Sequence, residues 1–487
     1  MGEPQPQGAV DAGALIVGND ARAEPDEGPR RSRLFDDGTR LAAADLHNHT
    51  LLSDGAGRPE DAFASLRDAG LDVAAVTDHA KIGKGILSRF DPCGRLAGTR
   101  PHGWCRGIVG LDEEGWRLTG RVADAADAAG VFTAIRGFEW THPTLGHVNV
   151  WFSPDWVDPL STSGVGWDGL GDELRRIPGI GPVLDQVLDS IPGDPGMRPL
   201  YDWLSAGGSA LAGFNHPGRE PGWFDAFRHD PRMADRVVSV EAFNKMDDYL
   251  FDSPHRSALA ACLDAGWRVG LLGVSDEHGD DWGRPAGKGR AGLWVRELSR
   301  RGVREALVAR RFFATRERGL RLDASADGVR MGGVVAHRRG PVTFALDVDA
   351  PGWAGRRVDI QVLRPGGELP AVAHVEEIVV PAGDQPVVRF AVPLDADDGR
   401  WVVLRLADPD APTDAPGPAH HPGNRRALAY ASPFWLDPAS ISTAGRAASG
   451  RRPRATEEAG GAFAGRRLDR GEASQLLMSE QPAGGWR

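Results

Sequence analysis

The segment LAAADLHNHT, residues 41–50, decides how the first part of the chain is interpreted. Its first six residues form a short, largely apolar run, which is typical of a strand buried on both faces of a sheet. His47 and His49 follow the run two positions apart, so their side chains leave the strand toward the same side. Both imidazoles can therefore reach one metal ion, although an isolated pair of this kind is equally common in surface loops.

Further apolar runs of the same kind follow along the chain. Segments with helical patterns lie between them, and those at 58–70, 118–130 and 253–266 each end on a glycine, as many helices do. Repeated alternation of strand and helix predicts a parallel α/β barrel or a doubly wound sheet. The six further runs are VAAVTD (73–78), FTAIRGFE (132–139), HVNVWF (147–152), ALAGFN (210–215), VVSVEAF (237–243) and RVGLLGVSD (268–276).

Histidines and carboxylates gather where these runs end. In parallel α/β folds, the carboxyl ends of the strands form the edge at which sites are built. Imidazole suits zinc, iron and manganese ions, and carboxylates complete such a site. The pattern therefore predicts a metal site that holds more than one ion. The residues at or just beyond these ends are His47, His49, Asp54, His79, Glu139, His216, Asp276 and His278, and His147 lies just after one of them.

The order of these motifs resembles that of a known family. DLHNHT followed by SDG, then TDH, GFEW with GH, NHPG and SDEHG, is similar to the PHP (polymerase and histidinol phosphatase) superfamily, and most of all to its CehA/McbA-like metallohydrolases. The resemblance covers about residues 41–320. It implies a distorted (β/α)7 TIM-like barrel and two or three divalent metal ions, which can be zinc, manganese or iron.

The resemblance also implies a role for each motif residue. One ion would take His47, His49, Glu139 and Asp276. A second ion would share Glu139 and take His147 and His216, and a third would take Asp54, His79 and His278. Many family members have histidine in place of Asp54, which leaves the occupancy of the third position open. Adjacent divalent ions activate water for attack on a phosphoryl group, and Asp276, His216 or His278 would transfer the proton.

Other polar residues near the strand ends are candidates for substrate binding. Asn244 and Lys245 follow the sixth run, and Arg219 follows His216. Guanidinium and ammonium groups suit a phosphate, and the alternative for each is a solvated surface position. Glu241 is either a carboxylate behind the metal ligands or an ordinary polar partner. His142 competes with His147, which fits the family motif better.

The pattern changes after about residue 325. Alternating apolar and polar residues with Pro-Gly and Gly-Asp turns predict a small antiparallel β domain that resembles a sandwich. The predicted layout is a flexible leader (1–38), the barrel (39–322) with insertions at 80–112 and 153–200, the β domain (323–437) and a disordered tail (438–487).

Composition narrows the function further. The 487 residues carry a formal net charge of -11, so a nucleic-acid partner is not expected. No stretch approaches the roughly 20 apolar residues of a membrane span, and the three cysteines form no CxxC pair, which favours a cytoplasmic protein. The leading hypothesis is a metal-dependent hydrolase of a small organic phosphate. Hydrolysis of a carbamate, amide or carboxylic ester and a non-catalytic, metal-stabilised binding protein are the alternatives, and the oligomeric state stays open.

Overall fold

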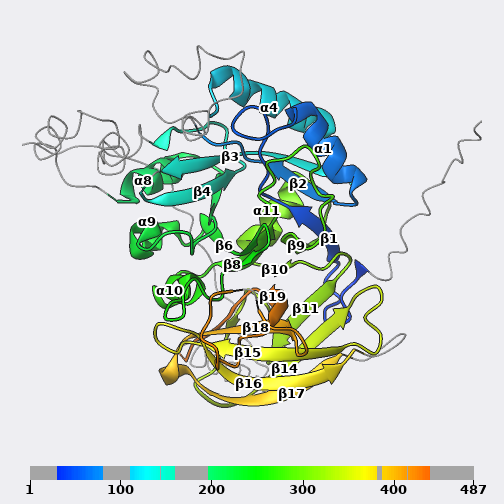
Figure 1. Cartoon of the computed structure of the whole chain (residues 1–487), viewed down its shortest axis with the longest axis vertical. Helices are drawn as coiled ribbons and strands as arrows, with labels where there is room; N and C mark the ends of the chain where they lie inside the picture. Colours follow the sequence, from blue (N-terminus) through cyan, green and yellow to red (C-terminus); the bar gives the residue numbers. More distant parts are fainter. Residues whose placement is uncertain are drawn as a thin grey trace, which may run out of the picture. The chain divides into compact units, whose positions relative to one another are not determined.

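The computed structural model describes residues 30–80, 110–142, 144–159, 196–380, 387–413 and 415–438. These residues belong to one compact unit (Figure 1). Most of the predicted leader, of the two insertions and of the tail lies outside the described residues. The predicted boundary between barrel and β domain stays a prediction. No helix in the described part is long and apolar enough to cross a membrane.

All seven predicted apolar runs form strands. The strand bounds lie within two residues of the expected ones, except that β3 extends three residues further, because short stretches buried on both faces are a strong local signal. The strands are β1 (Arg40–Asp45), β2 (Val73–Val76), β3 (Thr133–His142), β4 (Gly146–Trp151), β5 (Leu211–Phe214), β6 (Val237–Asn244) and β8 (Gly270–Val274).

The three predicted helices are present with altered starts. α1 spans Pro59–Asp68, whereas α4 (Glu113–Ala126) begins earlier than expected because the Asp112 side chain caps the amide of Gly115. α10 (Ala258–Asp264) begins later, after the cap residue Ser257. The other helical segments among the described residues of this half are α8 (Arg198–Ala206), α9 (Trp223–Ala226), the 3-10 turn η3 (Pro231–Met233) and α11 (Arg300–Val308).

The expectation of a wholly parallel sheet is wrong at β4. β1, β2 and β3 pair in parallel, and so do β5, β6 and β8, but β4 pairs antiparallel to both β3 and β5. β3 ends at His142 and β4 begins at Gly146. Because a parallel crossover needs a dozen or more residues, so short a connection can only make a hairpin.

The described strands do not close into the (β/α)7 barrel that the resemblance implies. β9 (Arg290–Val295) pairs antiparallel with β1 on one edge and with β10 (Phe312–Thr315) on the other. β10 in turn pairs with β19 (Arg426–Ala431). Both edges of β9 are therefore occupied, and within the described residues the ladder of β8 runs to β6 alone. The observed fold is a mixed α/β structure with a large open sheet.

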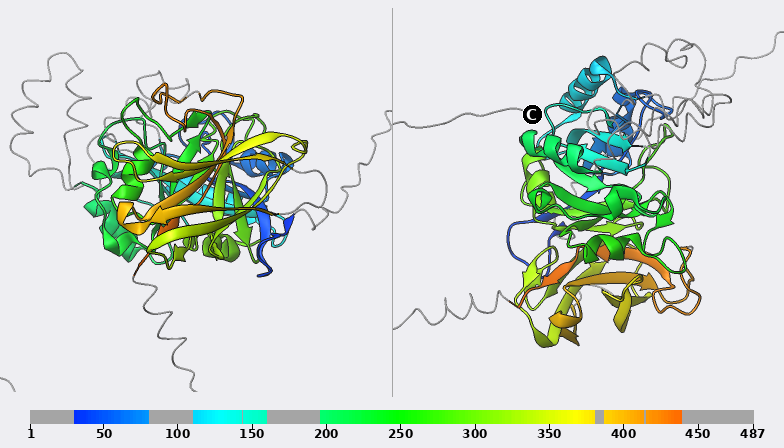
Figure 2. Two further views of the ribbon diagram at one scale, coloured as in Figure 1. Left: turned by 90° about the horizontal axis from the view of Figure 1, so that it is seen from below. Right: turned by 90° about the vertical axis from the view of Figure 1, so that its left-hand side faces the viewer.

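The C-terminal β region, defined as β11 to β20, forms two layers at one end of the α/β part (Figure 2), whose strands pair antiparallel except for the parallel pair β13 and β20. An apolar core that includes Phe344, Ile360 and Leu404 lies between the layers. One layer contains β12 (Val329–Arg330), β11 (Arg321–Ala326), β14 (Arg339–Asp349) and β17 (Val388–Asp395). The other contains β16 (Ala371–Val379), β15 (Arg357–Arg364), β18 (Trp401–Asp408), β19, β20 (Phe434–Leu436) and β13 (Val334–Val335).

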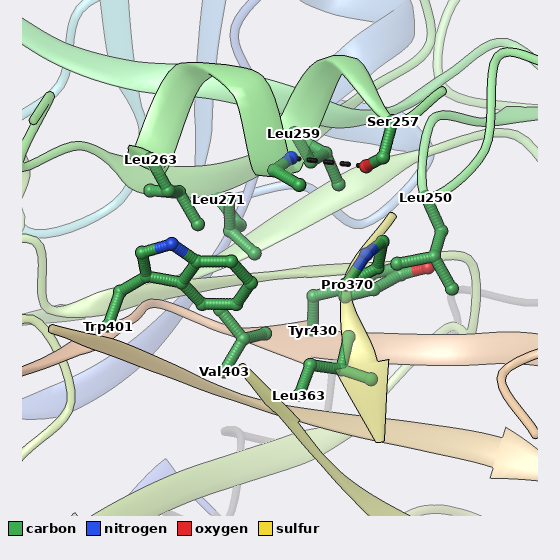
Figure 3. A pocket seen from close by; sticks show the side chains of 11 residues that line it. Leu250, Ser257, Leu259, Leu263, Leu271, Leu363, Pro370, Trp401, Val403 and Tyr430 are labelled. Carbon is green, nitrogen blue, oxygen red and sulfur yellow. Dashed lines mark hydrogen bonds between the residues drawn. The ribbon is translucent and has the colours of Figure 1, made fainter. Parts of the chain in front are cut away.

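The two regions share more than a connecting chain. Because β19 pairs with β10, the second layer continues the large sheet of the α/β part. A small apolar pocket lies between the regions, with Leu259 and Leu263 of α10 on one side and Leu363, Trp401 and Val403 on the other (Figure 3). The C-terminal β region is therefore packed directly beneath the strands that carry the candidate site.

Candidate metal centre

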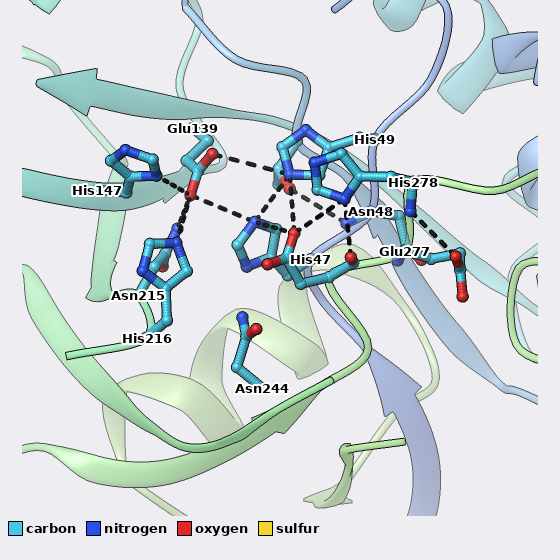
Figure 4. Close-up of polar contacts among 12 residues, drawn as sticks. His47, Asn48, His49, Glu139, His147, Asn215, His216, Asn244, Glu277 and His278 are labelled. Atoms are coloured by element: carbon cyan, nitrogen blue, oxygen red, sulfur yellow. Dashed lines mark hydrogen bonds and ion pairs between the residues drawn. The ribbon is translucent and has the colours of Figure 1, made fainter. Parts of the chain in front are cut away.

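The predicted ligands meet at the edge of the sheet where the parallel strands end. His47 and His49 follow β1, His79 follows β2, and Glu139 lies in β3. Isolated parallel bridges join His79 to Glu139, and Asn48, just after β1, to Glu277, just after β8. Figure 4 shows imidazoles from several of these elements grouped around Glu139. The elements thus bring together side chains that are far apart in the sequence.

The first cluster contains His47, His49, Glu139 and Asp276. The Nε2 atoms of the two histidines lie 3.0 Å apart. Asp276 Oδ1 lies 3.2 Å from His49 Nε2, and Glu139 Oε1 lies 3.4 Å from His47 Nε2. Ligand atoms about 2.1 Å from one ion are separated by roughly 3.0–3.4 Å in octahedral or tetrahedral geometry. Ligand atoms of His47, His49 and Glu139 therefore lie close enough together to bind one ion, and Asp276 Oδ1 adjoins both histidines.

The second cluster shares Glu139 with the first. Glu139 Oε1 lies 3.2 Å from His147 Nδ1 and 3.4 Å from His216 Nε2. The amide of Asn215 donates a hydrogen bond of 2.7 Å to the same oxygen. Because Glu139 Oε1 faces histidines of both clusters, this carboxylate is placed where a bridging ligand would stand.

The third cluster contains His49, Asp54, His79 and His278. Asp54 Oδ1 lies 3.3 Å from His79 Nε2, 3.2 Å from His278 Nε2 and 3.8 Å from His49 Nδ1. His278 Nδ1 lies 2.9 Å from the carbonyl oxygen of Asp276, to which it can only donate. That hydrogen bond leaves the lone pair of Nε2 directed toward the cluster. Asp54 thus stands among the three histidines of this cluster.

The protonation states of side chains in the three clusters suit the binding of cations. Burial would raise the pKa of Glu139 and of Asp276, but the surrounding histidines hold both well below their usual range. Burial lowers the pKa of His49 and of His216 to about 3, so both imidazoles are neutral. Ionised carboxylates and neutral imidazoles are the protonation states that metal binding requires.

Two other histidines take up protons in the absence of a cation. Burial would lower the pKa of His47, but Asp276, Glu241 and Glu139 raise it well above its ordinary value. Glu139 and Asp54 likewise raise the pKa of His79 to about 10, against the effect of burial. A divalent ion would replace these protons as the positive charge that the carboxylates need.

The donor set fits divalent metal ions. Among the described residues, three groups of side chains have ligand atoms close enough to hold a metal: His49, Asp54, His79 and His278; His47, His49 and Glu139; and His79, Glu139 and His147. All the donors are nitrogen or carboxylate oxygen, which zinc, manganese and iron accept. The residues are therefore able to bind metal, and the number and identity of the ions stay predictions.

Glu241 lies behind the ligands and orients them. Its Oε1 lies 2.8 Å from His47 Nδ1, and its Oε2 accepts hydrogen bonds from the His216 amide (2.6 Å) and from Asn244 Nδ2 (2.8 Å). A carboxylate on one nitrogen of a ligating histidine fixes which nitrogen faces the metal. The structure thus places Glu241 in the outer role that its sequence position left open.

Sequence reasoning missed two residues that organise the site. The Asp78 carboxylate accepts hydrogen bonds from the Thr50 amide (2.7 Å), the Thr50 hydroxyl (2.8 Å) and the Ser53 hydroxyl (2.6 Å). It thereby holds the loop that leads to Asp54. Asn215, described above, fixes Glu139. Asp78 and Asn215 each directly precede a predicted ligand at a strand end, and this position is the sequence feature that could have identified them.

Three residues at the site have left-handed backbone conformations. His216 (φ 30°), Lys245 (φ 52°) and Asp276 (φ 46°) each stand just after a strand, and none is glycine. Such conformations cost about 1–3 kcal/mol each and are concentrated at functional sites. The turns direct three side chains of the site across the sheet edge.

Two cations converge on the outer oxygen of Asp276. Asp276 Oδ2 lies 3.2 Å from Arg219 Nη2 and 3.4 Å from Lys245 Nζ, whereas Oδ1 faces the histidines. The side chains of Arg219 and Lys245 are 36% and 38% exposed. Asn244 is buried between Glu241 and Arg219, and its Oδ1 lies 3.4 Å from Arg219 Nη2. Of the three predicted substrate residues, Arg219 and Lys245 reach solvent, and Asn244 stands behind them.

Aromatic residues surround the centre. His142 stacks on Trp140 at 5.2 Å, and its Nδ1 accepts a hydrogen bond from the Leu145 amide. His142 thus belongs to the β3–β4 turn, while His147 faces Glu139. Trp223 stacks on His147 with ring centroids 5.3 Å apart.

Comparison with models of known protein families gives no match, and comparison with curated protein sequences gives none. The chain is similar to solved structures that include PHP-like metal-dependent phosphoesterases. One is a two-domain protein from Bacteroides vulgatus that contains a predicted PHP-like metal-dependent phosphoesterase (16% identity, TM-score 0.38, covering 81% of this chain and 96% of that one).

A second is a candidate metal-dependent phosphoesterase from Bifidobacterium adolescentis (15% identity, TM-score 0.26, covering 49% of this chain and 88% of that one). A third is an amidohydrolase from Chromobacterium violaceum with bound sulfate and no metal (15% identity, TM-score 0.24, covering 48% of this chain and 87% of that one). At these TM-scores the chemical assignment rests on the side-chain geometry described above.

Proposed function

We propose that this protein is a metal-dependent phosphoesterase of the PHP type that acts on a small organic phosphate. The observation that carries the proposal is the position of Arg219 and Lys245. Both cations touch the outer oxygen of Asp276, whose inner oxygen lies 3.2 Å from a histidine of the first cluster. A phosphate that touches both cations would stand directly beside the candidate ligands. Membership of the CehA/McbA-like branch and a cytoplasmic location stay predictions.

The residues of the chain bind and orient the substrate in this proposal. Arg219 and Lys245 supply donors to the phosphate oxygens, and the guanidinium can hold two of them at once. Asn244 and Asp276 keep the Arg219 guanidinium in place. Divalent ions bound to the three clusters would lower the pKa of a water molecule and neutralise phosphoryl oxygens.

Proton transfer to the leaving group is assigned among Asp276, His216 and His278. Asp276 is fully engaged by histidines and cations, and His216 is only 1% exposed. His278 has a side chain that is 29% exposed and a hydrogen bond that fixes its Nδ1. Of the three side chains, that of His278 is the most exposed, so His278 would serve as the proton donor only where its Nε2 is not a metal ligand.

The test combines metal analysis with a substrate panel. Protein loaded with manganese, zinc or iron is assayed on p-nitrophenyl phosphate, bis-p-nitrophenyl phosphate and p-nitrophenyl acetate. We expect the phosphomonoester to be hydrolysed fastest, chelation to abolish the activity, and the exposed residue change His255→Ala to leave it unaltered. Full activity after chelation would overturn the metal dependence.

The same panel addresses the other hydrolase chemistry considered from the sequence. Metal-activated water can attack carbon or phosphorus, so the candidate ligands by themselves do not select a phosphate. A clear preference for the acetate would replace the phosphoesterase by a carboxylic ester, carbamate or amide hydrolase with the same ligands.

A further inference from the structure

The turn that carries Lys245 has two faces. β6 and the short strand β7 (Asp247–Asp248) form a hairpin in which Phe243 pairs with Asp248, and Asn244 with Asp247. Successive residues of a strand point to opposite faces, so Asn244 and Phe243 face opposite ways. Asn244 faces Glu241 and Arg219 at the candidate site. Phe243 and its partner Asp248 face the C-terminal β region.

A buried ion pair holds the far face of this hairpin. Asp248 Oδ1 accepts a hydrogen bond of 2.7 Å from the Tyr430 hydroxyl, and Asp248 Oδ2 lies 3.5 Å from Arg405 Nη2. The side chains of Arg405 and Asp248 are 0% and 3% exposed. Arg405 also donates to the Tyr430 hydroxyl, to Gln361 Oε1 and to the carbonyl oxygens of residues 423 and 425. A buried network whose donors are all used is rigid.

Ring contacts and a hydrogen bond reinforce this anchorage on both sides of Lys245. The rings of Phe243 and Tyr430 meet edge to face with centroids 5.1 Å apart. The Arg316 guanidinium lies 4.5 Å from the Phe243 ring centroid and donates to the Met246 carbonyl. Lys245 itself has a φ of 52°, a conformation that persists only where the surroundings impose it.

We propose that Asp248, Arg405 and Tyr430 are positioning residues for substrate binding. Through the hairpin they hold Lys245, and through Asn244 they hold Arg219, where both cations meet the anionic group of the substrate. The C-terminal β region thereby contributes to affinity for the phosphate group and not to metal binding. This inference rests on the proposed function, because it takes Lys245 and Arg219 as the anion site.

The variant Tyr430→Phe tests the inference, since it removes one hydroxyl and keeps the ring against Phe243. Calorimetry measures the binding of inorganic phosphate to manganese-loaded protein, and assays give KM and kcat for p-nitrophenyl phosphate. The hydroxyl makes two hydrogen bonds, with Asp248 and with Arg405, and their loss reaches Lys245 only through the hairpin. We therefore expect phosphate affinity to fall about five-fold, the size of one net hydrogen bond, with a matching rise in KM. Bound metal and kcat should stay unchanged. Asp248→Asn, which removes the charge facing Arg405, is the second variant.

Trp401→Phe is the matched control. Trp401 Nε1 donates a 2.6 Å hydrogen bond to Asp264, at the end of α10, across the same boundary between the regions. Figure 3 shows Trp401 and Tyr430 on the same side of the small pocket. Loss of this hydrogen bond does not touch the hairpin, so phosphate affinity should not change. Equal weakening by Trp401→Phe would show that Tyr430 acts through general stability and would overturn the inference.

A double-mutant cycle with Lys245→Met locates the coupling. If Tyr430 acts through Lys245, then Tyr430→Phe should weaken phosphate binding much less in the Lys245→Met background than in the wild type. Equal effects in both backgrounds, or unaltered phosphate affinity of Tyr430→Phe, would overturn the inference. Wild-type protein that binds phosphate but hydrolyses no ester would refute the proposed function alone. A wild type that binds no phosphate would overturn both.

Discussion

His47 in the metal centre and Leu404 in the C-terminal β region are both 0% exposed, but different forces keep them there. Leu404 is surrounded by apolar side chains, and its burial is favourable by itself. His47 is surrounded by carboxylates and other histidines, whose burial is costly without compensating charge. Burial of Leu404 therefore stabilises the fold, whereas burial of His47 depends on the charges around it. Substitutions in each region should therefore separate effects on stability from effects on activity.

The largest effect should come from His47→Ala. This change removes a predicted ligand of the first cluster and leaves Glu241 without its imidazole partner. Loss of a residue behind the ligands commonly costs 10–100-fold in metal affinity or activity, so loss of a ligand should cost more than about a hundredfold. Metal analysis and kcat measure the effect. Unaltered activity with full metal content would contradict the assignment of His47.

Leu404→Ala should act on stability alone. A buried leucine replaced by alanine costs about 2–5 kcal/mol of unfolding free energy, because a cavity remains. The free energy of unfolding from a denaturant titration measures this cost, and kcat of the folded protein at low temperature should match the wild type. A large fall in kcat would mean that the two regions do not divide their roles in this way.

Glu241→Gln should have an intermediate effect at the boundary of the metal centre. Glutamine retains one acceptor, but its NH₂ group opposes the donors that Glu241 now receives from the His216 amide and Asn244. We expect metal affinity to fall about 10–100-fold. Activity measured during a titration with manganese gives the metal affinity. Unaltered affinity would show that Glu241 is an ordinary polar partner and does not orient the ligands.

The smallest effect should come from Arg219→Lys. Lysine retains the charge beside Asp276 but loses the planar fork that can hold two phosphate oxygens. We expect KM for p-nitrophenyl phosphate to rise about ten-fold, the value of one charge-assisted hydrogen bond, while bound metal is unaltered. A change in metal content without a change in KM would show that Arg219 supports metal binding and not substrate binding.

The strands of the α/β part could be predicted because each is a short run with a strong local pattern. The direction of β4 was also within reach, since the short segment between His142 and Gly146 excludes a crossover. The open sheet could not be predicted, because it depends on the pairing of β10 with β19, and these strands are more than a hundred residues apart in the sequence. No local pattern encodes such a partner.

The site divides in a similar way. The candidate ligands come together because strand ends meet at one edge, a property of the fold that the motif order already carried. The roles of Asp78 and Asn215 were not evident, since a residue beside a ligand can point toward the site or away from it. The burial of Asn244 follows from tertiary contacts with Glu241 and Arg219, which the sequence does not display.

The continuous sheet also bears on the order in which the protein can mature. β1, which leads into His47 and His49, pairs with β9, which is completed by β10 and then by β19. During synthesis the first ligands leave the ribosome long before β19 does. Until residues 426–431 arrive, one edge of β10 stays unpaired and open to association with other chains. In a nascent chain, His47 and His49 are thus synthesised early, but the sheet that supports them is complete only after β19 has been made.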